Sequence, residues 1–502
     1  MTSPHGPRTD TAGPDDAPDR TPATPGAGED AAATARPSGA VAGLALGLVV
    51  VILVGGIGVL EYPAELMLIV AAAALTIVAA CYGVSLAQVL TDMGQKIKRA
   101  LPAILILLSI GLLIGTWMIA GTIPLMVSLG LELIDPSYLY VLAFVVTAIV
   151  ASFTGTSWGA GGTIGVALIG VASTMDISLA VTAGAVVSGA YFGDKLSPLS
   201  DTTNMSSLAA GANIYEHIRH MLYTSGPSAL LALVVFFVAG LSIDAESVDL
   251  QIIDATTAQL HELFTLNPVL LIPPVVVLAG SVWKKPPLIV LSVSTVSAMV
   301  LAVAVQGFSL AEVFTATIEG FSSTDMLGGE VSDALTELLD RGGLYSMYNS
   351  AFFVFCAFFF AAALENAGVL RVLLARMIER LRSTGSLVLA TLISGFAIIN
   401  GTSNALVTFF LVKDLYGEAY RRRNLHPVNL SRSMEDSITI TEVLMPWTVS
   451  GVFFATTLGV GNFEFLPWAI FCWAGIVFSA LVAVLSPLTR GFGIRPLEPA
   501  TR

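Results

Sequence analysis

Apolar runs of about 20 residues recur along this 502-residue chain, and they constrain its fold more than any other feature. Each run is long enough to cross the roughly 30 Å of hydrocarbon in a bilayer. Clear examples are Val41 to Leu60, Ala64 to Tyr82, Leu101 to Ile119, Leu222 to Leu241 and Phe463 to Leu485. Only 12% of the residues are charged, about half the usual fraction in soluble proteins. The sequence therefore predicts an all-α polytopic membrane protein with about 12 to 14 transmembrane helices.

The basic residues predict which side of the membrane each segment faces. Of the 23 Lys and Arg residues, all but Lys195, Arg341 and Lys413 lie in the two tails or in short segments expected on one face. Those segments are Gln95 to Arg99, Arg219, Lys284-Lys285, Arg371 to Arg382, Arg421 to Arg423 and Arg432. By the positive-inside rule this face is cytoplasmic, which places both termini in the cytoplasm of a multi-pass protein of the cell membrane.

Composition divides the chain into six parts. The expected boundaries are a disordered cytoplasmic tail at 1–38, N-terminal transmembrane helices at 39–90, a first transporter repeat at 91–241, connecting helices with acidic external loops at 242–343, a second repeat at 344–487 and a cytoplasmic C-terminal tail at 488–502. The three cysteines are scattered singly and indicate neither a disulfide nor a metal site. No Gly-Lys dipeptide occurs, so a phosphate-binding loop and a nucleotide-driven pump are not expected.

Three short matches suggest an internal repeat. Gly155-Thr156-Ser157 recurs as Gly401-Thr402-Ser403, 246 residues later, and Ala120-Gly121 recurs as Ala367-Gly368, 247 residues later. Asp194 and Asp201 are spaced like Glu435 and Glu442, displaced by 241. We expect two inverted-topology repeats with broken or re-entrant helices, whose Gly-Thr-Ser turns meet near the midplane and offer oxygen ligands from Thr156, Ser157, Thr402 and Ser403 to a small cation.

Carboxylates within apolar segments are the candidate ion-binding groups, because each costs at least about 2.5 to 3.5 kcal/mol to insert. The candidates are Asp194, Asp201, Glu365, Asp414, Glu435, Asp436 and Glu442, with Lys195 and Lys413 as internal cations. Pro198 lies between Asp194 and Asp201 and predicts a broken helix there. A carboxylate in a water-poor site holds its proton tightly and a bound cation displaces that proton, which is the minimal chemistry of cation/proton exchange.

Structural alternatives stay open for several of these residues. Asp194 could pair with Lys195, Asp201 could cap a cytoplasmic helix, and Glu435 or Asp436 could pair with Arg432 at the membrane interface. His217 and His220 have the spacing of a metal or pH-sensing pair, but an interfacial elbow is favoured. Trp158 and Trp447 are expected in packing or lipid contact, and the glycine-rich stretch Trp158 to Gly165 in close helix packing or an unwound segment.

The stretch S-G-A-Y-F-G-D-K-L-S-P-L-S-D-T-T-N at 188–204, followed by E-H-I-R-H-M, resembles the signature of the NhaC family of sodium/proton antiporters. The run L-S-R-S-M-E-D-S-I-T-I-T-E-V-L-M-P-W at 430–447 is similar to the Glu-Asp and Pro-Trp region of that family. The resemblance implies an inverted-repeat fold and Na⁺ efflux driven by proton entry. It highlights Asp194, Ser197, Asp201, Thr202, Thr203 and Asn204, and then Glu435, Asp436 and Pro446-Trp447. The chain departs from the family pattern at Ile438-Thr439 and Thr448, where a substrate could touch.

The leading hypothesis is a secondary transporter that exchanges cytoplasmic Na⁺ for external H⁺, with Na⁺ at Asp194 and Asp201. No enzymatic activity, no cofactor and no nucleic-acid partner are expected; the partners are Na⁺, H⁺ and membrane lipid, and a homo-oligomer is compatible with the sequence. The family also includes exchangers of organic acids, such as malate for lactate, so a proton- and sodium-coupled exchanger of small carboxylates or amino acids is the alternative. An intramembrane protease is disfavoured because Tyr191 stands where its Gly-x-Gly-Asp motif requires glycine.

Overall fold

The computed structural model describes residues 37–60, 62–243, 250–327, 331–378, 381–486 and 492–497. These residues are nearly all helical and contain no strand, only an isolated backbone bridge between Leu425 and Pro496. Because lipid offers no partners for backbone groups, a chain made of membrane spans must satisfy them internally, as helices do. The predicted all-α polytopic membrane fold is confirmed. Most of the predicted tails, 1–36 and 498–502 included, lies outside the described residues.

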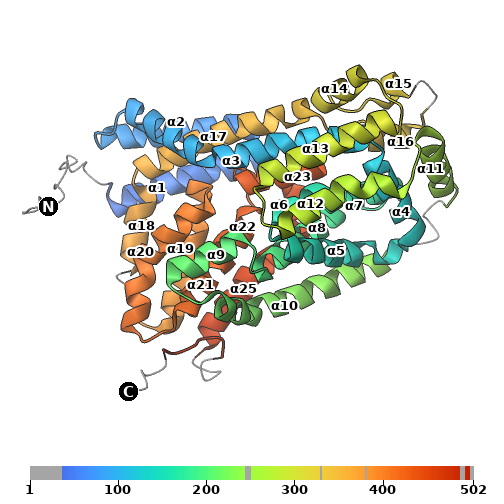
Figure 1. The fold of residues 1–502 in the computed structure, drawn as a ribbon. Helices are drawn as coiled ribbons and strands as arrows, with labels where there is room; N and C mark the ends of the chain where they lie inside the picture. Colours follow the sequence, from blue (N-terminus) through green and yellow to red (C-terminus); the bar gives the residue numbers. More distant parts are fainter. Residues whose placement is uncertain are drawn as a thin grey trace, which may run out of the picture. The chain divides into compact units, whose positions relative to one another are not determined.

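The helices fall into an N-terminal group, a first half, a connecting group and a second half (Figure 1). The N-terminal group is α1 (Gly39–Val50), η1 (Val51–Val59) and α2 (Ala64–Cys81). The first half is α3 (Leu86–Ile119), α4 (Thr122–Leu133), η2 (Pro136–Tyr138), α5 (Leu139–Thr154), α6 (Ser157–Ala160), η3 (Gly161–Gly165), α7 (Val166–Thr174), α8 (Leu179–Leu196), α9 (Asp201–Ala210) and α10 (Ile214–Leu241). The connecting group is α11 (Leu250–Leu263), η4 (Pro268–Leu271), α12 (Ile272–Val282), α13 (Pro287–Ala304), α14 (Leu310–Ile318), α15 (Ser323–Met326), α16 (Asp333–Leu339) and η5 (Leu344–Met347). The second half is α17 (Tyr348–Asn366), α18 (Val369–Ile378), α19 (Thr384–Thr402), α20 (Ala405–Arg422), α21 (Pro427–Met434), η6 (Glu435–Thr439), α22 (Ile440–Glu442), α23 (Val449–Leu458), α24 (Asn462–Phe465), η7 (Leu466–Trp468) and α25 (Ile470–Leu485).

Within the described residues, eight helices are long and apolar enough to cross a membrane. Two helix pairs reach that length together but bend by 95° and 91°, which raises the number to ten if each pair is one span. The sequence predicted 12 to 14 spans. The difference arises partly because α8 and α20 are 18 residues long but carry charged residues, and partly because α6, α7, α21 and α23 are short pieces of interrupted helices.

The outer faces of the long helices are apolar. α10, for example, exposes Leu230, Val234, Val238 and Leu241 along its length, each with more than half of its surface accessible. Extended apolar stripes of this kind are rare on soluble proteins and fit contact with lipid chains.

Helix ends reveal the internal repeat with a spacing of 247 or 248 residues. The predicted Ala-Gly match at 247 is confirmed, because Gly121 and Gly368 are both left-handed and follow the equivalent helices α3 and α17. Left-handed backbone conformations occur at Gly155 and Ser403, at Asp176 and Asn424, and at Gly211 and Gly459, each pair 248 residues apart. The N-cap residues follow the same spacing: Thr156 and Asn404, Ser178 and His426, Ser200 and Thr448. Because left-handed residues and caps mark where helices stop and start, the two halves share one succession of elements.

This spacing corrects the predicted register. The displacement of 246 between the Gly-Thr-Ser matches is two residues less than 248. The displacement of 241 between Asp194 and Glu435 is seven residues less, which is about two helical turns. At the spacing of 248 shown by the helix ends, Asp194 corresponds to Glu442 and Pro198 to Pro446. Short sequence matches can shift along a helix without penalty, whereas backbone conformations at helix ends cannot.

Equivalent helices of the two halves pack against each other in opposite directions. Lys96 near the start of α3 donates to Glu365 near the end of α17 at 2.6 Å, whereas Gly111 farther along α3 accepts from the backbone of Gly343, just before η5 and α17, at 2.9 Å. α10 packs against α25 in the same pairing of equivalents. Antiparallel packing of equivalent helices is what inverted topology requires.

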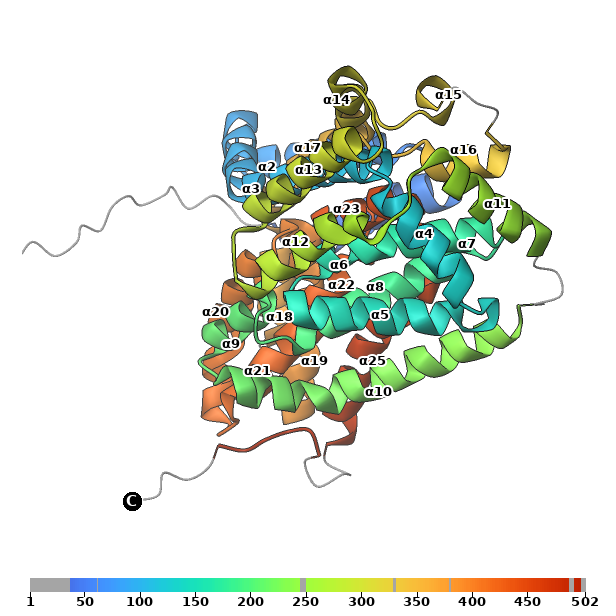
Figure 2. The ribbon, with the colours of Figure 1, turned by 45° about the vertical axis from the view of Figure 1, so that its right-hand side comes forward.

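The acidic connecting segments gather at one end of the helices. Figures 1 and 2 show α11 and α14 to α16 together at the end opposite α9 and α20. The turn between α12 and α13, with Lys284 and Lys285, lines a cavity together with Asp201 of α9. The basic turn and the acidic segments therefore lie at opposite ends, in agreement with the predicted charge asymmetry.

The close packing of α5 on α8 depends on glycine. A methyl group at Gly189 would lie 2.2 Å from the carbonyl oxygen of Phe144, too close without backbone movement. We expect Gly189→Ala to destabilise the protein by about 1 to 3 kcal/mol, measured as a lower thermal unfolding midpoint in detergent. Gly226→Ala on α10 is the matched control, since nothing lies within 4 Å of its added methyl group. Equal midpoints for the two variants would contradict this packing.

Candidate ion-binding site

A cavity of about 640 Å³ opens beside the break between α8 and α9. Its wall is formed by the turn between α5 and α6, by the break itself and by the turn between α12 and α13. The structure thereby brings together six of the predicted site residues, namely Thr156, Ser157, Asp194, Asp201, Thr202 and Asn204. Lys284 and Lys285, which are not among the predicted site residues, also line the cavity.

The break between α8 and α9 is held by specific hydrogen bonds and is not a frayed helix end. α8 ends at Leu196, Pro198 follows, and Ser200 caps α9 by accepting from the Thr203 backbone. The Asn204 side chain donates to the carbonyl oxygens of Pro198 at 2.9 Å and of Ser200 at 2.7 Å. The predicted break at Pro198 is confirmed, and its freed carbonyl groups are satisfied locally.

Two other predicted residues of this segment support the break from behind. The Ser197 hydroxyl donates to the Ser152 carbonyl at 2.7 Å, and the Thr203 hydroxyl donates to the Lys195 carbonyl at 3.1 Å. Both side chains are buried and neither lines the cavity. They fasten α8 and α9 to their neighbours.

Asp194 is a buried carboxylate that forms no ion pair with any described residue. Its side chain is 5% exposed, it lies next to Ser157 and Ser200, and its Oδ1 atom accepts no hydrogen bond from the described part of the chain. Lys195, the partner considered from the sequence, pairs with Asp436 instead. The alternative in which Asp194 merely neutralises Lys195 is therefore wrong.

Asp201 occupies a different environment. It is the first residue of α9, is solvent-exposed and lies beside the cavity. An acidic side chain in the first helical turn interacts favourably with the helix dipole. Ser200 and not Asp201 caps α9, so the capping alternative for Asp201 is wrong, whereas its place in the cavity wall is compatible with the predicted site.

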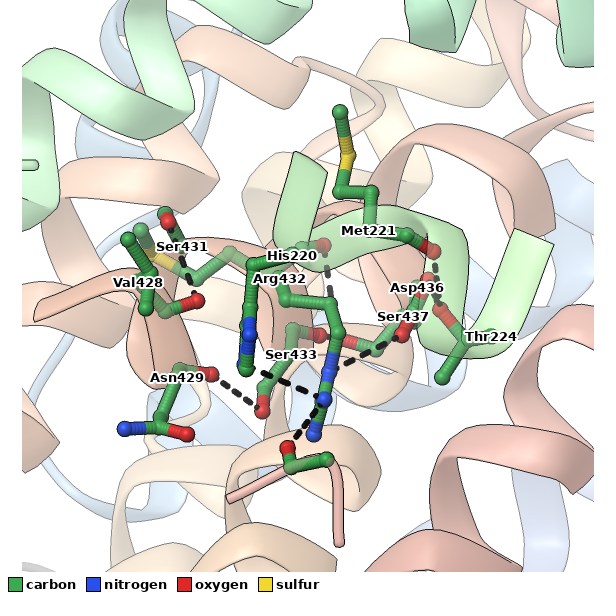
Figure 3. Close-up of polar contacts among 12 residues, drawn as sticks. His220, Met221, Thr224, Val428, Asn429, Ser431, Arg432, Ser433, Asp436 and Ser437 are labelled. Atoms are coloured by element: carbon green, nitrogen blue, oxygen red, sulfur yellow. Dashed lines mark hydrogen bonds and ion pairs between the residues drawn. The ribbon is translucent and has the colours of Figure 1, made fainter. Parts of the chain in front are cut away.

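Asp436 is the centre of a buried charge network between α8, α10 and η6, and Figure 3 shows its contacts with Arg432 and Thr224. It pairs with Lys195, accepts from the Thr224 hydroxyl at 3.2 Å, and faces the Arg432 guanidinium at 3.8 Å. All three charged side chains are inaccessible to solvent. Arg432, expected on the cytoplasmic face, is instead buried and is also held by the Gly493 carbonyl.

Glu435 and the two histidines extend this network. The Ser206 hydroxyl donates to Glu435 at 2.8 Å and lies 3.2 Å from His217, whose other ring nitrogen lies 2.7 Å from Ser431. His220 lies 3.2 Å from Arg432. Both histidines are buried near the start of α10, just after the turn that follows α9, so the predicted elbow is present but encloses their side chains. The ring nitrogens of His217 contact Ser206 of α9 and Ser431 of α21, and His220 contacts Arg432 of α21. The described residues contain no cluster suited to a metal ion.

The second Gly-Thr-Ser turn does not join the first. Thr402 lines a separate cavity of about 250 Å³ with Glu365 and Asp414, and this cavity shares no described lining residue with the larger one. The Ser403 hydroxyl lies 3.5 Å from the Trp447 carbonyl. Glu365 and Asp414 form exposed pairs with Lys96 and Lys413, and such pairs contribute little to stability.

Trp158 and Glu442 connect the cavity to the second half. Trp158 lines the cavity, donates to Ser450 at 3.3 Å and stacks on Phe453 with ring centroids 4.5 Å apart. Glu442 lies beside Ser450 and Tyr191. It was a candidate carboxylate but was left out of the predicted site; the signal that finds it is the repeat distance of 248.

The sequence matches a known protein family and several known proteins. Residues 189–486 match the family described as the Na⁺/H⁺ antiporter family. Over 454 residues, 90% of this chain and 96% of the relative, the chain is 42% identical to an uncharacterized Na⁺/H⁺ antiporter of Haemophilus influenzae. It is 34% identical over 432 residues (85% and 91%) to Na⁺/H⁺ antiporter NhaC of Alkalihalophilus pseudofirmus. It is 33% identical over 427 residues (85% and 89%) to the malate-2H⁺/Na⁺-lactate antiporter of Bacillus subtilis.

The network predicts unequal effects of removing its charges. Asp436→Asn leaves Lys195 and Arg432 buried without their shared carboxylate, a loss expected to cost about 3 to 5 kcal/mol. Lys195→Met leaves Asp436 paired with Arg432 and Thr224, so its effect should be smaller. Thermal unfolding of the purified variants in detergent measures both. A larger loss for Lys195→Met would show that Asp436 is not the centre of the network.

Proposed function

The chain belongs to the Na⁺/H⁺ antiporter family, and from this premise we propose that it exchanges cytoplasmic Na⁺ for external H⁺, with Asp194 binding each ion in turn. The observation that carries the proposal is the position of Asp194. Its carboxylate is buried at the wall of a cavity and has no ion-pair partner among the described residues. A buried charge without compensation is unstable, so the site favours states in which Na⁺ or H⁺ neutralises it.

Competition at one carboxylate couples the two ions. A proton on Asp194 removes the charge that attracts Na⁺, and bound Na⁺ disfavours the protonated form. Oxygen atoms suit Na⁺ as a small hard cation, and the hydroxyls of Ser157 and Ser200 lie beside Asp194. Na⁺ that enters the cavity would therefore exchange water for protein oxygens as it expels the proton.

The other predicted residues have supporting roles in this proposal. Asp201, Thr156, Thr202 and Asn204 line the approach to Asp194. Asp436 holds α8 in place through Lys195, and Glu435 holds α9 through Ser206, so they act as positioning residues. Thr402 and Ser403 belong to the corresponding turn of the second half.

Inverted halves with broken helices supply the means of alternating access. In this proposal the turn with Lys284 and Lys285 faces the cytoplasm, as the positive-inside rule favours. The cavity is then open to the cytoplasm in this structure, and both termini lie on the same side. The protein is a multi-pass membrane protein, and we place it in the cell membrane.

The organic-acid alternative rests on the same cavity. Lys284 and Lys285 line it, and ammonium groups attract carboxylates. One relative is the malate-2H⁺/Na⁺-lactate antiporter. The absence of a buried cation beside Asp194, however, favours a cation as the ion bound there.

Asp194→Asn removes the charge while preserving the shape of the side chain. We expect the variant to lose Na⁺-dependent proton release in everted membrane vesicles and to remain folded in the membrane, because amide oxygens attract Na⁺ far less than a carboxylate does. Glu418→Gln is the control, since Glu418 is exposed and pairs only with Arg421 and Arg422 on its own helix. Normal exchange by Asp194→Asn would refute the assignment.

Substrate choice is tested in proteoliposomes. We expect a Na⁺ gradient to drive proton movement without any organic acid, and labelled malate or lactate to remain outside. Counterflow of either acid, lost in a Lys284→Gln and Lys285→Gln double variant, would instead establish the organic-acid exchanger.

A further inference from the structure

We propose that Glu442 is a second proton-binding carboxylate of the exchange cycle, related to Asp194 by the internal repeat and used for H⁺ rather than Na⁺. The inference rests on the proposed function of Asp194. It assigns to the second half a chemical task that differs from that of the first half.

The local backbone around Glu442 repeats that around Asp194. Each carboxylate lies at the end of a helix, four residues before a proline, and the following helix is capped by a hydroxyl residue, Ser200 or Thr448. Thr448 also donates to the Glu442 carbonyl oxygen at 2.5 Å, which fastens the second break. The repeat therefore presents one acidic side chain at each break.

Glu442 has no compensating cation among the residues that the structure describes. It is half-buried, and none of the ion pairs within the described ranges includes it. The Ser450 hydroxyl and backbone lie beside its carboxylate. An acid in this position is stable in its neutral form, hydrogen-bonded and without a charge to compensate.

The titratable groups around Glu442 come from two neighbouring elements and its own helix. α8 contributes Tyr191, whose hydroxyl lies near both Glu442 and Asp194, and α25 contributes Cys472. Glu435 and Asp436 lie on the preceding turns and are engaged by Ser206 and Lys195. α19 and α23, which also pack here, carry no titratable residue. Tyr191 is thus a titratable neighbour of both carboxylates.

The oxygen atoms available at the two breaks differ. Four polar cavity residues near Asp194 have apolar counterparts in the second half, namely Ala405 for Ser157, Leu411 for Thr163, Val449 for Asp201 and Val452 for Asn204. The other four have polar counterparts, namely Thr402 for Thr154, Asn404 for Thr156, Thr448 for Ser200 and Ser450 for Thr202. The first break therefore offers more oxygen atoms than the second. A Na⁺ ion needs several oxygen ligands to replace its water, whereas a proton needs one carboxylate. The first break suits Na⁺, and the second suits H⁺.

Electrostatics couples the two sites. A protonated Glu442 is neutral, and Na⁺ on ionised Asp194 leaves that site neutral too, whereas ionised Glu442 attracts Na⁺ in a region with little water to screen the charges. Loss of the Glu442 proton therefore favours Na⁺ binding at ionised Asp194, and by linkage bound Na⁺ favours that loss. The cycle then exchanges about two protons for each Na⁺ and moves net charge across the membrane.

Counting protons tests the proposal. Purified protein in weakly buffered detergent solution is titrated with Na⁺, with a pH indicator to count released protons and radioactive Na⁺ to count bound ions. We expect about two protons per Na⁺ for the unaltered protein, about one for Glu442→Gln, and two again for Glu442→Asp, which restores a titratable group. Glu418→Gln is the control and should match the unaltered protein.

Transport across proteoliposomes gives a second readout. An imposed membrane potential should drive Na⁺ uptake by the unaltered protein but not by Glu442→Gln, which should still respond to a pH gradient.

One proton per Na⁺ in the unaltered protein, or an unchanged count in Glu442→Gln, overturns the proposal. So does loss of Na⁺ binding by folded Glu442→Gln, which would make Glu442 a Na⁺ ligand. If Glu442→Gln does not fold, the number of protons released per Na⁺ by the unaltered protein and by Glu442→Asp decides, and it should be about two for both. Na⁺ binding without any proton release would instead refute the proposed exchange itself.

Discussion

A charge held away from water must be compensated where it lies, and the arrangement of α8, α10 and η6 depends on this requirement. Lys195 and Arg432 are compensated by Asp436, and Thr224 completes the coordination of that carboxylate. This network fixes α8 against the second half and so positions the break that follows it. Asp194, one residue before Lys195, is left outside the network. The protein thus separates carboxylates that hold its helices together from a carboxylate free to bind an ion.

The membrane fold and the first part of the site could be predicted from sequence because their signals are local. Runs of apolar residues indicate spans, and Pro198 between two aspartates indicates a broken helix. The partner of Lys195 could not be predicted in this way, since Asp436 lies 241 residues away and their contact depends on how α8 packs beside η6. The burial of Arg432, His217 and His220 was missed for the same reason: their residue types suggest an aqueous surface, and only the packing of α9, α10 and α21 encloses them.

The repeat was recognised from sequence but in the wrong register. A three-residue match and a spacing of seven recur by chance within helices, so they could not exclude displacements of 241 and 246. The Ala-Gly match at 247 does mark equivalent helix ends, since Gly121 and Gly368 are both left-handed. Helix ends could decide, because a left-handed residue such as Gly155 or Ser403 stands at one place in the backbone and cannot slide. The correct register matters chemically: it pairs Asp194 with Glu442, two carboxylates at breaks, instead of pairing Asp194 with Glu435, which Ser206 already engages.

The antiparallel packing of α3 on α17 and of α10 on α25 has an energetic consequence for the conformational cycle. When the contact between two halves is made by equivalent helices, tilting the halves one way or the other exchanges one set of contacts for its counterpart. The two end states then differ little in packing energy, and the balance between them is governed by the side chains in which the halves differ. Those include the four polar cavity residues of the first half, Ser157, Thr163, Asp201 and Asn204, whose counterparts in the second half are apolar. A difference of a few kcal/mol in ion binding is enough to shift such an equilibrium almost completely, so a gradient of small ions can drive the protein without any nucleotide.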